Sequence, residues 1–163
     1  MDIHKLKSKI IPPMTREHRE GFDNEEILLS LNEEERDEII IFLNDYLSTK
    51  YDPLVIESMI ILNSKESINT LKVKLGSTTN IFEKIDIISG IYSITKDLDM
   101  IIRINETMQD VIRKKLKYSE IDIVGMLSYL LRFDKNDIKA ILEHFSKSRK
   151  YLISYHAKKM LDA

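Results

Sequence analysis

Apolar residues recur at every third or fourth position along most of the chain after residue 25, which is the spacing of amphipathic α-helices. Candidate helix starts stand where a side-chain oxygen can accept from free backbone N–H groups: Asn32, Asp52 before Pro53, Ser119 and Asp134. Only four glycines and three prolines interrupt the pattern, which argues against a fold rich in strands and tight turns. The sequence therefore predicts an all-α protein with helices over residues 24–31, 33–48, 53–63, 65–76, 81–96, 98–117, 120–133, 135–147 and 151–162.

The first 22 residues do not follow this pattern. They contain the pair Pro12-Pro13, which the interior of a helix does not tolerate. We expect residues 1–22 to form an extended or partly ordered N-terminal arm, which the pair Ile10-Ile11 can attach to the body. Residues 23–163 are expected to form a single α-helical repeat domain.

A weak internal repeat runs through the middle of the chain. With Ile68, Ile101 and Ile138 as anchors, at offsets of 33 and 37 residues, the positions 14 and 7 before and 3 and 7 after each anchor are all apolar. A residue able to cap a helix stands four positions before each anchor, namely Ser64, Asp97 and Asp134. Each unit is therefore predicted to be two helices joined by a tight turn. Five side chains are expected to be almost fully buried between stacked helices: Ile61, Ile94, Ile101, Leu131 and Ile138.

This apolar spacing and turn position resemble HEAT-like repeats, and more loosely armadillo-like repeats, over roughly residues 52–147. The resemblance implies a short right-handed solenoid of about four helical hairpins. Residues 24–48 would form an atypical N-terminal cap, and residues 151–162 would close the other end. The resemblance also implies a groove lined by the second helices, with Arg103, Glu106, Lys139 and Glu143 on its surface. A plain helix bundle is the alternative fold.

The sequence lacks the common residue patterns of catalytic and metal-binding sites. The chain has no cysteine, which excludes disulfides, cysteine-ligated metals and a thiol nucleophile. The four histidines form no pair at helical spacing, and the isolated glycines form no phosphate-binding loop. We therefore expect a non-enzyme without a metal, nucleotide or other cofactor. The enzymatic alternatives are a pair of carboxylates that folding brings together and an alkylpurine DNA glycosylase built from HEAT-like repeats. The absence of tryptophan argues against the second.

No apolar run approaches the roughly 18 residues that a membrane span requires. The first eleven residues carry charge throughout and lack the apolar centre of a secretory signal. We therefore expect no membrane segment and a cytoplasmic location.

Charge is distributed unevenly along the chain, although the net charge is only −2. Residues 17–45 hold eleven acidic residues against Arg19 and Arg36, whereas residues 113–117 and 139–163 are rich in lysine and arginine. On a helix, Glu34, Asp37 and Glu38 share one face, and Glu35 points toward another. This segment predicts an acidic surface that attracts a basic partner.

These features together predict a non-catalytic protein–protein interaction module, of which a bacterial immunity-type inhibitor or an adaptor is a concrete form. The expected partner is another protein, and two surfaces are candidates for binding it. One is Glu34, Asp37 and Glu38; the other is the groove set Arg103, Glu106, Lys139 and Glu143. Tyr118, Tyr151 and Tyr155 are candidate aromatic anchors near the basic end. The alternative is a nucleic-acid-binding repeat protein that uses the basic C-terminal end, which the overall charge disfavours.

Overall fold

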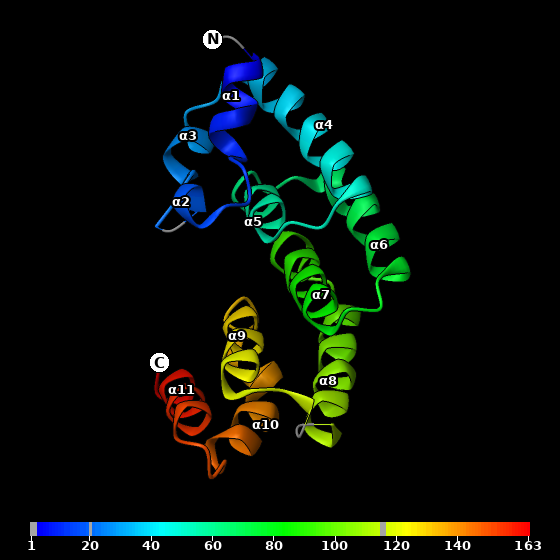
Figure 1. Cartoon of the computed structure of the whole chain (residues 1–163). Helices are drawn as coiled ribbons and strands as arrows, with labels where there is room; N and C mark the ends of the chain where they lie inside the picture. Colours follow the sequence, from blue (N-terminus) through cyan, green and yellow to red (C-terminus); the bar gives the residue numbers. More distant parts are fainter. Residues whose placement is uncertain (1–2, 20, 115–116) are drawn as a thin grey trace. The chain divides into compact units, whose positions relative to one another are not determined.

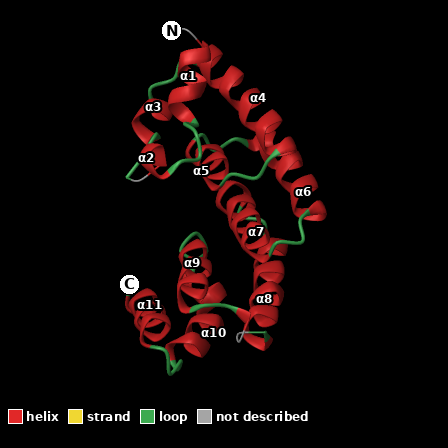
Figure 2. Ribbon diagram, in the orientation of Figure 1, coloured by secondary structure: helices red, strands yellow, loops and turns green. Residues whose placement is uncertain are grey.

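The computed structural model describes residues 3–19, 21–114 and 117–163, and all regular elements in these ranges are helices (Figure 2). The all-α prediction is therefore confirmed. The chain divides into two compact units, Met1–Ser77 and Thr78–Ala163.

The first unit is organised around one long helix, α4 (Figure 1). This helix packs against α1, α5, η1 and α6, while α3 packs against α5. The α4 side chains that face these neighbours, Ile39, Leu43 and Leu47, are fully buried. The elements of this unit are α1 (Ile3–Ile10), α2 (Arg16–Arg19), α3 (Glu25–Leu29), α4 (Glu33–Thr49), α5 (Pro53–Ile61), the 3₁₀ helix η1 (Lys65–Ser67) and α6 (Ile68–Ser77).

The N-terminal segment contains two helices, α1 and α2, where the sequence analysis expects an extended or partly ordered arm. Ile3, Leu6 and Ile10 are spaced to form a short apolar stripe, and Leu6 and Ile10 are fully buried. Ile11 is also buried, so both residues of the pair Ile10-Ile11 lie in the core.

The described residues of the second unit contain the helices α7 to α11 (Figure 1). Helix α7 packs against α8 and α9, and α9 packs against α11. Helix α10 packs against α8 and α11. Helices two apart in the sequence are therefore neighbours, as in α7–α9–α11 and α8–α10. The bounds are α7 (Ile81–Thr95), α8 (Leu98–Arg113), α9 (Glu120–Leu130), α10 (Lys135–Ser146) and α11 (Tyr151–Asp162).

Most of the predicted helix caps are present. Asn32 and Ser119 each form a capping box with the acidic residue three positions later, and Asp52 accepts from the N–H of Leu54. Asp134 stands at the N-cap position of α10 but forms no capping hydrogen bond. Its carboxylate instead accepts from the Tyr92 hydroxyl, at 3.1 Å.

The repeat alignment predicts burial correctly at only some positions. Ile94 and Ile138 are buried as expected, whereas Ile61 and Ile101 are half-buried. Leu131 is 65% exposed, so its predicted burial is wrong. Helix α9 ends at Leu130, which is fully buried, and Leu131 is the C-cap residue that follows it.

Ile61 and Ile101 lie beside the buried stripes of their helices. On α5 the buried apolar residues are Val55, Ile56 and Met59, so the last residue of the helix falls on its flank. On α8 the buried stripe is Met100, Ile104, Met108 and Val111, one position away from the predicted anchor. The fifteen apolar positions identify the helices but do not give the exact buried face.

Candidate protein-binding surfaces

The predicted acidic surface lies on α4. Glu34, Asp37 and Glu38 are exposed, and so is Asp45 two turns beyond Glu38. Ile41 stands among these carboxylates and is 61% exposed. With 3.6 residues per turn, the five residues share one side of the helix. We refer to Glu34, Asp37, Glu38, Ile41 and Asp45 as the α4 face.

Neighbouring charges on α4 do not neutralise this face. Arg36, the one basic residue of α4, is half-buried and donates from Nη2 to the carbonyl oxygen of Leu62 at 2.6 Å. Glu35 accepts from the backbone N–H of Asn32 at 3.3 Å, so it points away from the other carboxylates, as predicted. Across the described residues, no ion pair involves a carboxylate of the α4 face.

The predicted groove residues lie on two helices that pack against each other. Arg103 and Glu106 are on α8, Lys139 and Glu143 are on α10, and all four are exposed. The structure thus brings the two pairs onto adjacent helices. That they line a binding groove stays a prediction.

The two cations of the groove set have partners on their own helices. Arg103 Nε lies 2.6 Å from Asp99 Oδ2, and Lys139 Nζ lies 3.9 Å from Glu143 Oε1. Exposed pairs at helical spacing contribute little to stability, so these groups remain available to a partner.

A third exposed surface is formed by α11. Tyr151 is 73% exposed and Tyr155 is 46% exposed, and their rings stack with centroids 5.8 Å apart. Leu152 beside them is also exposed, as are Lys158 and Lys159 further along the helix. We refer to Tyr151, Leu152, Tyr155, Lys158 and Lys159, together with Lys150 before the helix, as the α11 face. Tyr118, the other predicted aromatic anchor, is half-buried.

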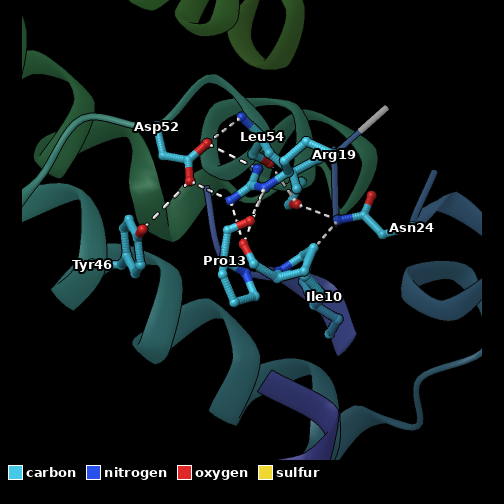
Figure 3. A network of polar contacts seen from close by, with 9 residues as sticks. Ile10, Pro13, Arg19, Asn24, Tyr46, Asp52 and Leu54 are labelled. Atoms are coloured by element: carbon cyan, nitrogen blue, oxygen red, sulfur yellow. Dashed lines mark hydrogen bonds and ion pairs between the residues drawn. The ribbon is translucent and has the colours of Figure 1, made fainter. Parts of the chain in front are cut away.

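A polar network holds the N-terminal segment to the start of α5 (Figure 3). Arg19 donates from Nη1 and Nη2 to the two oxygens of Asp52, at 3.2 and 2.7 Å, and also to the carbonyl oxygen of Pro12. The Asp52 carboxylate additionally accepts from Leu54 N and from the Tyr46 hydroxyl. Asp52 is almost fully buried, and its oxygens are occupied within the fold. We therefore assign this carboxylate a structural role.

The surroundings of Asp52 also affect Tyr46. Burial is the main factor that raises the pKa of the Tyr46 hydroxyl above 10.0, and the negative charge of Asp52 adds to the effect. Arg19 opposes it. The folded state therefore favours the protonated phenol of Tyr46, which can donate its hydrogen bond to Asp52.

The second unit contains a comparable buried ion pair. Asp86 in α7 is fully buried, and Arg132 in the turn between α9 and α10 donates from Nη1 to its Oδ1 at 2.6 Å. The same nitrogen also lies 2.9 Å from Ser89 Oγ. The guanidinium further lies over the Tyr129 ring, 5.3 Å from its centroid. This pair fastens the turn after α9 to the centre of α7.

Tyr92 connects α7 to the start of α10. Its ring stacks on Phe133, with centroids 4.4 Å apart, and its hydroxyl donates to Asp134. Burial raises the pKa of Tyr92 above 10.0, and the hydrogen bond to Asp134 and the nearby charge of Asp137 contribute further. The folded state therefore favours the protonated phenol.

The raised pKa of Tyr92 makes the free energy of unfolding depend on pH in the alkaline range. Because the pKa of Tyr92 is higher in the folded than in the unfolded state, its contribution to stability is complete below about pH 10 and is lost as the pH rises further. We expect the free energy of unfolding of Tyr92→Phe to fall less steeply above about pH 10 than that of the wild type. Urea unfolding across this range measures the difference. The exposed Tyr155→Phe is the control, and equal slopes for Tyr92→Phe and the wild type would contradict the assignment.

The described ranges contain no group of three or more histidine, aspartate or glutamate residues placed to hold a metal ion. The helices in those ranges are too short or too polar to cross a membrane.

Several residues of these surfaces escaped the sequence analysis. Ile41 and Leu152 are apolar and fit the helical pattern of buried positions, so nothing local distinguishes them from core residues. Asp45 lies seven residues after Glu38 and therefore on the same helix face. Helical periodicity could have placed it on the acidic surface.

Comparison with family models, curated proteins and solved structures finds no match for this chain.

Proposed function

We propose that this chain is a non-catalytic protein–protein interaction module, of which a bacterial immunity-type inhibitor or an adaptor is a concrete form. The observation that carries the proposal is the α4 face, where an exposed isoleucine is surrounded by exposed carboxylates. Apolar contact at the centre and charge at the rim are the common arrangement of a protein interface. The partner that fits is a protein with a basic surface around an apolar contact.

We further propose that the module is built from HEAT-like repeats in a short right-handed solenoid of about four hairpins. The alternating contacts of α7–α9–α11 and α8–α10 support this arrangement, because stacked hairpins place every second helix side by side. Stacked repeats expose long surfaces, which suits a binding role.

The acidic side chains are expected to act mainly on the rate of association. Exposed charges at the rim of an interface steer a partner of opposite charge toward it, and salt screens the effect. We expect Glu34→Lys, Asp37→Lys and Glu38→Lys together to slow association by about tenfold or more at low salt and to flatten its salt dependence. Affinity capture from the source cell with the wild-type chain identifies the partner, and surface plasmon resonance then measures its association rate.

A second triple variant controls for net charge. Glu17→Lys, Glu26→Lys and Asp110→Lys change the same number of exposed acidic residues outside α4. We expect this variant to retain most of the wild-type association rate. If both variants associate at the wild-type rate, the α4 face is not the site, and Arg103, Glu106, Lys139 and Glu143 are tested next.

Nucleic-acid binding is the second candidate, favoured by the basic end of the second unit. The last residue of α8, the segment after it and the turn after α10 expose six basic residues: Arg113, Lys114, Lys117, Lys147, Arg149 and Lys150. Lys115 and Leu116, which belong to the same predicted basic segment, lie outside the described residues. Phosphate contacts release counterions, so such binding must weaken steeply with salt.

An electrophoretic mobility shift with single-stranded RNA and duplex DNA tests this candidate. If the basic end binds phosphates, the affinity should fall about a hundredfold or more between 50 and 200 mM salt. Lys147→Glu, Arg149→Glu and Lys150→Glu together should then abolish the shift. Absence of a shift at low salt and micromolar protein eliminates this function.

A further inference from the structure

We propose that the α11 face docks onto the α4 face of a second copy of this chain, so that copies associate head to tail. The inference rests on the proposed function of the α4 face and names its basic partner. Two observations carry it: the unpartnered apolar and basic face of α11, and its complementarity in charge and order to the α4 face.

Among the described residues of its own unit, no helix covers the α11 face. Helix α11 packs against α9 and α10 through Ile153 and Ala157, which are buried. Tyr151, Leu152 and Tyr155 project from other positions and remain exposed. Two tyrosines and a leucine make a large apolar cluster to leave exposed on one helix.

The two faces match in the order of their side chains along the helix. On α11 the apolar cluster is flanked by Lys150 on one side and by Lys158 and Lys159 on the other. On α4 the apolar residue Ile41 is likewise flanked, by Asp45 on one side and by Glu34, Asp37 and Glu38 on the other. The α11 face therefore has the order basic–apolar–basic, and the α4 face has the order acidic–apolar–acidic. Both extend over a similar length of helix. Contact between the two faces buries the exposed apolar groups and pairs charges that have no ion-pair partner within the described residues.

Charge also selects this pairing over the symmetric alternatives. Two α11 faces in contact would oppose lysine to lysine, and two α4 faces would oppose carboxylate to carboxylate. A heterologous contact leaves one face of each kind free at the ends of a dimer, so further copies can add or a ring can close. Faces of this size correspond to small, weak interfaces, so assembly requires micromolar concentrations and low salt.

Sedimentation velocity of the full chain over a concentration series tests the proposal. At about 20 mM salt and some hundreds of micromolar protein, we expect the weight-average mass to rise at least twofold above the monomer mass, and to return to it at about 0.5 M salt. Reversal of the α4 face (Glu34→Lys, Asp37→Lys, Glu38→Lys) should leave the chain monomeric. Reversal of the α11 face (Lys150→Glu, Lys158→Glu, Lys159→Glu) should do the same.

The decisive measurement is the chain that carries all six reversals. Lysines at positions 34, 37 and 38 then face glutamates at positions 158 and 159, so the main flanks stay complementary and the net charge is unchanged. Only Asp45 opposes a like charge, at Lys150→Glu, so we expect most of the assembly to be restored. Circular dichroism verifies that each variant is folded. Tyr151→Ser with Tyr155→Ser, which leaves the charge intact, should weaken assembly by at least tenfold.

Three results would overturn the proposal. They are a wild type that stays monomeric at every concentration, single-face variants that still assemble, and a six-reversal chain that does not.

A monomeric chain that binds a uridine homopolymer through Tyr155, Lys158 and Lys159 would assign the α11 face to nucleic acid instead. If the wild type is monomeric but captures another protein through the α4 face, the second copy is excluded and the proposed function stands. If assembly is absent and capture does not depend on α4, both fail.

Discussion

Replacement of Arg132 by methionine is expected to lower the free energy of unfolding by about 3–5 kcal/mol, because it leaves the buried Asp86 carboxylate without its guanidinium. Asp86 is fully buried and Arg132 is only 17% exposed, so water cannot readily replace the lost partner. Denaturant unfolding followed by circular dichroism measures the change.

An exposed ion pair of the same length provides the matched control. Arg103 Nε and Asp99 Oδ2 are also 2.6 Å apart, but both side chains are 52% exposed. Arg103→Met should therefore cost no more than about 1 kcal/mol. The double variant Asp86→Leu with Arg132→Met removes both buried charges and should recover much of the loss. Similar costs for Arg132→Met and Arg103→Met would show that burial does not set the strength of the inner pair.

The second large expected effect is a difference in stability loss between two adjacent leucines at the end of α9. Leu130 is fully buried and Leu131 is 65% exposed. Leu130→Ala should cost about 2–5 kcal/mol, since it leaves a cavity in the core of the second unit. Leu131→Ala should change the stability by no more than about 0.5 kcal/mol.

The same unfolding experiment tests the repeat alignment directly. The alignment predicts that Leu131 is a core residue, whereas the structure assigns this place to Leu130. A larger loss for Leu131→Ala than for Leu130→Ala would favour the sequence-based alignment over the observed burial.

The success of the helix predictions has a local cause. Caps such as Asn32 and Ser119 act within four residues, and the helical period repeats within one element, so both can be read from a short window of sequence. Helix α1 is absent from the predicted helices, because its three apolar residues make too short a stripe to distinguish a helix from an arm near two prolines.

The buried face and the surfaces depend on contacts between distant residues. Arg19 and Asp52 are 33 positions apart, and Asp86 and Arg132 are 46 apart, so their pairing is decided by tertiary packing. Asp86 lies in the apolar run from Ile85 to Ile91, and a charged residue there signals a buried polar partner without identifying it. The exposure of Ile41 has no local signal of this kind.

The burial of the middle of α7 affects how the second unit opens locally. All residues from Ile85 to Tyr92 are buried, so this segment has no solvent-facing side around a full two turns. Helix α11, by contrast, contacts α9 and α10 and keeps one face exposed. Helix α11 can detach transiently while α8 and α9 still cover α7, so we expect α11 to have a lower local stability than α7. We therefore expect the amide hydrogens of α7 to exchange with solvent only through the largest opening motions, and those of α11 through the smallest.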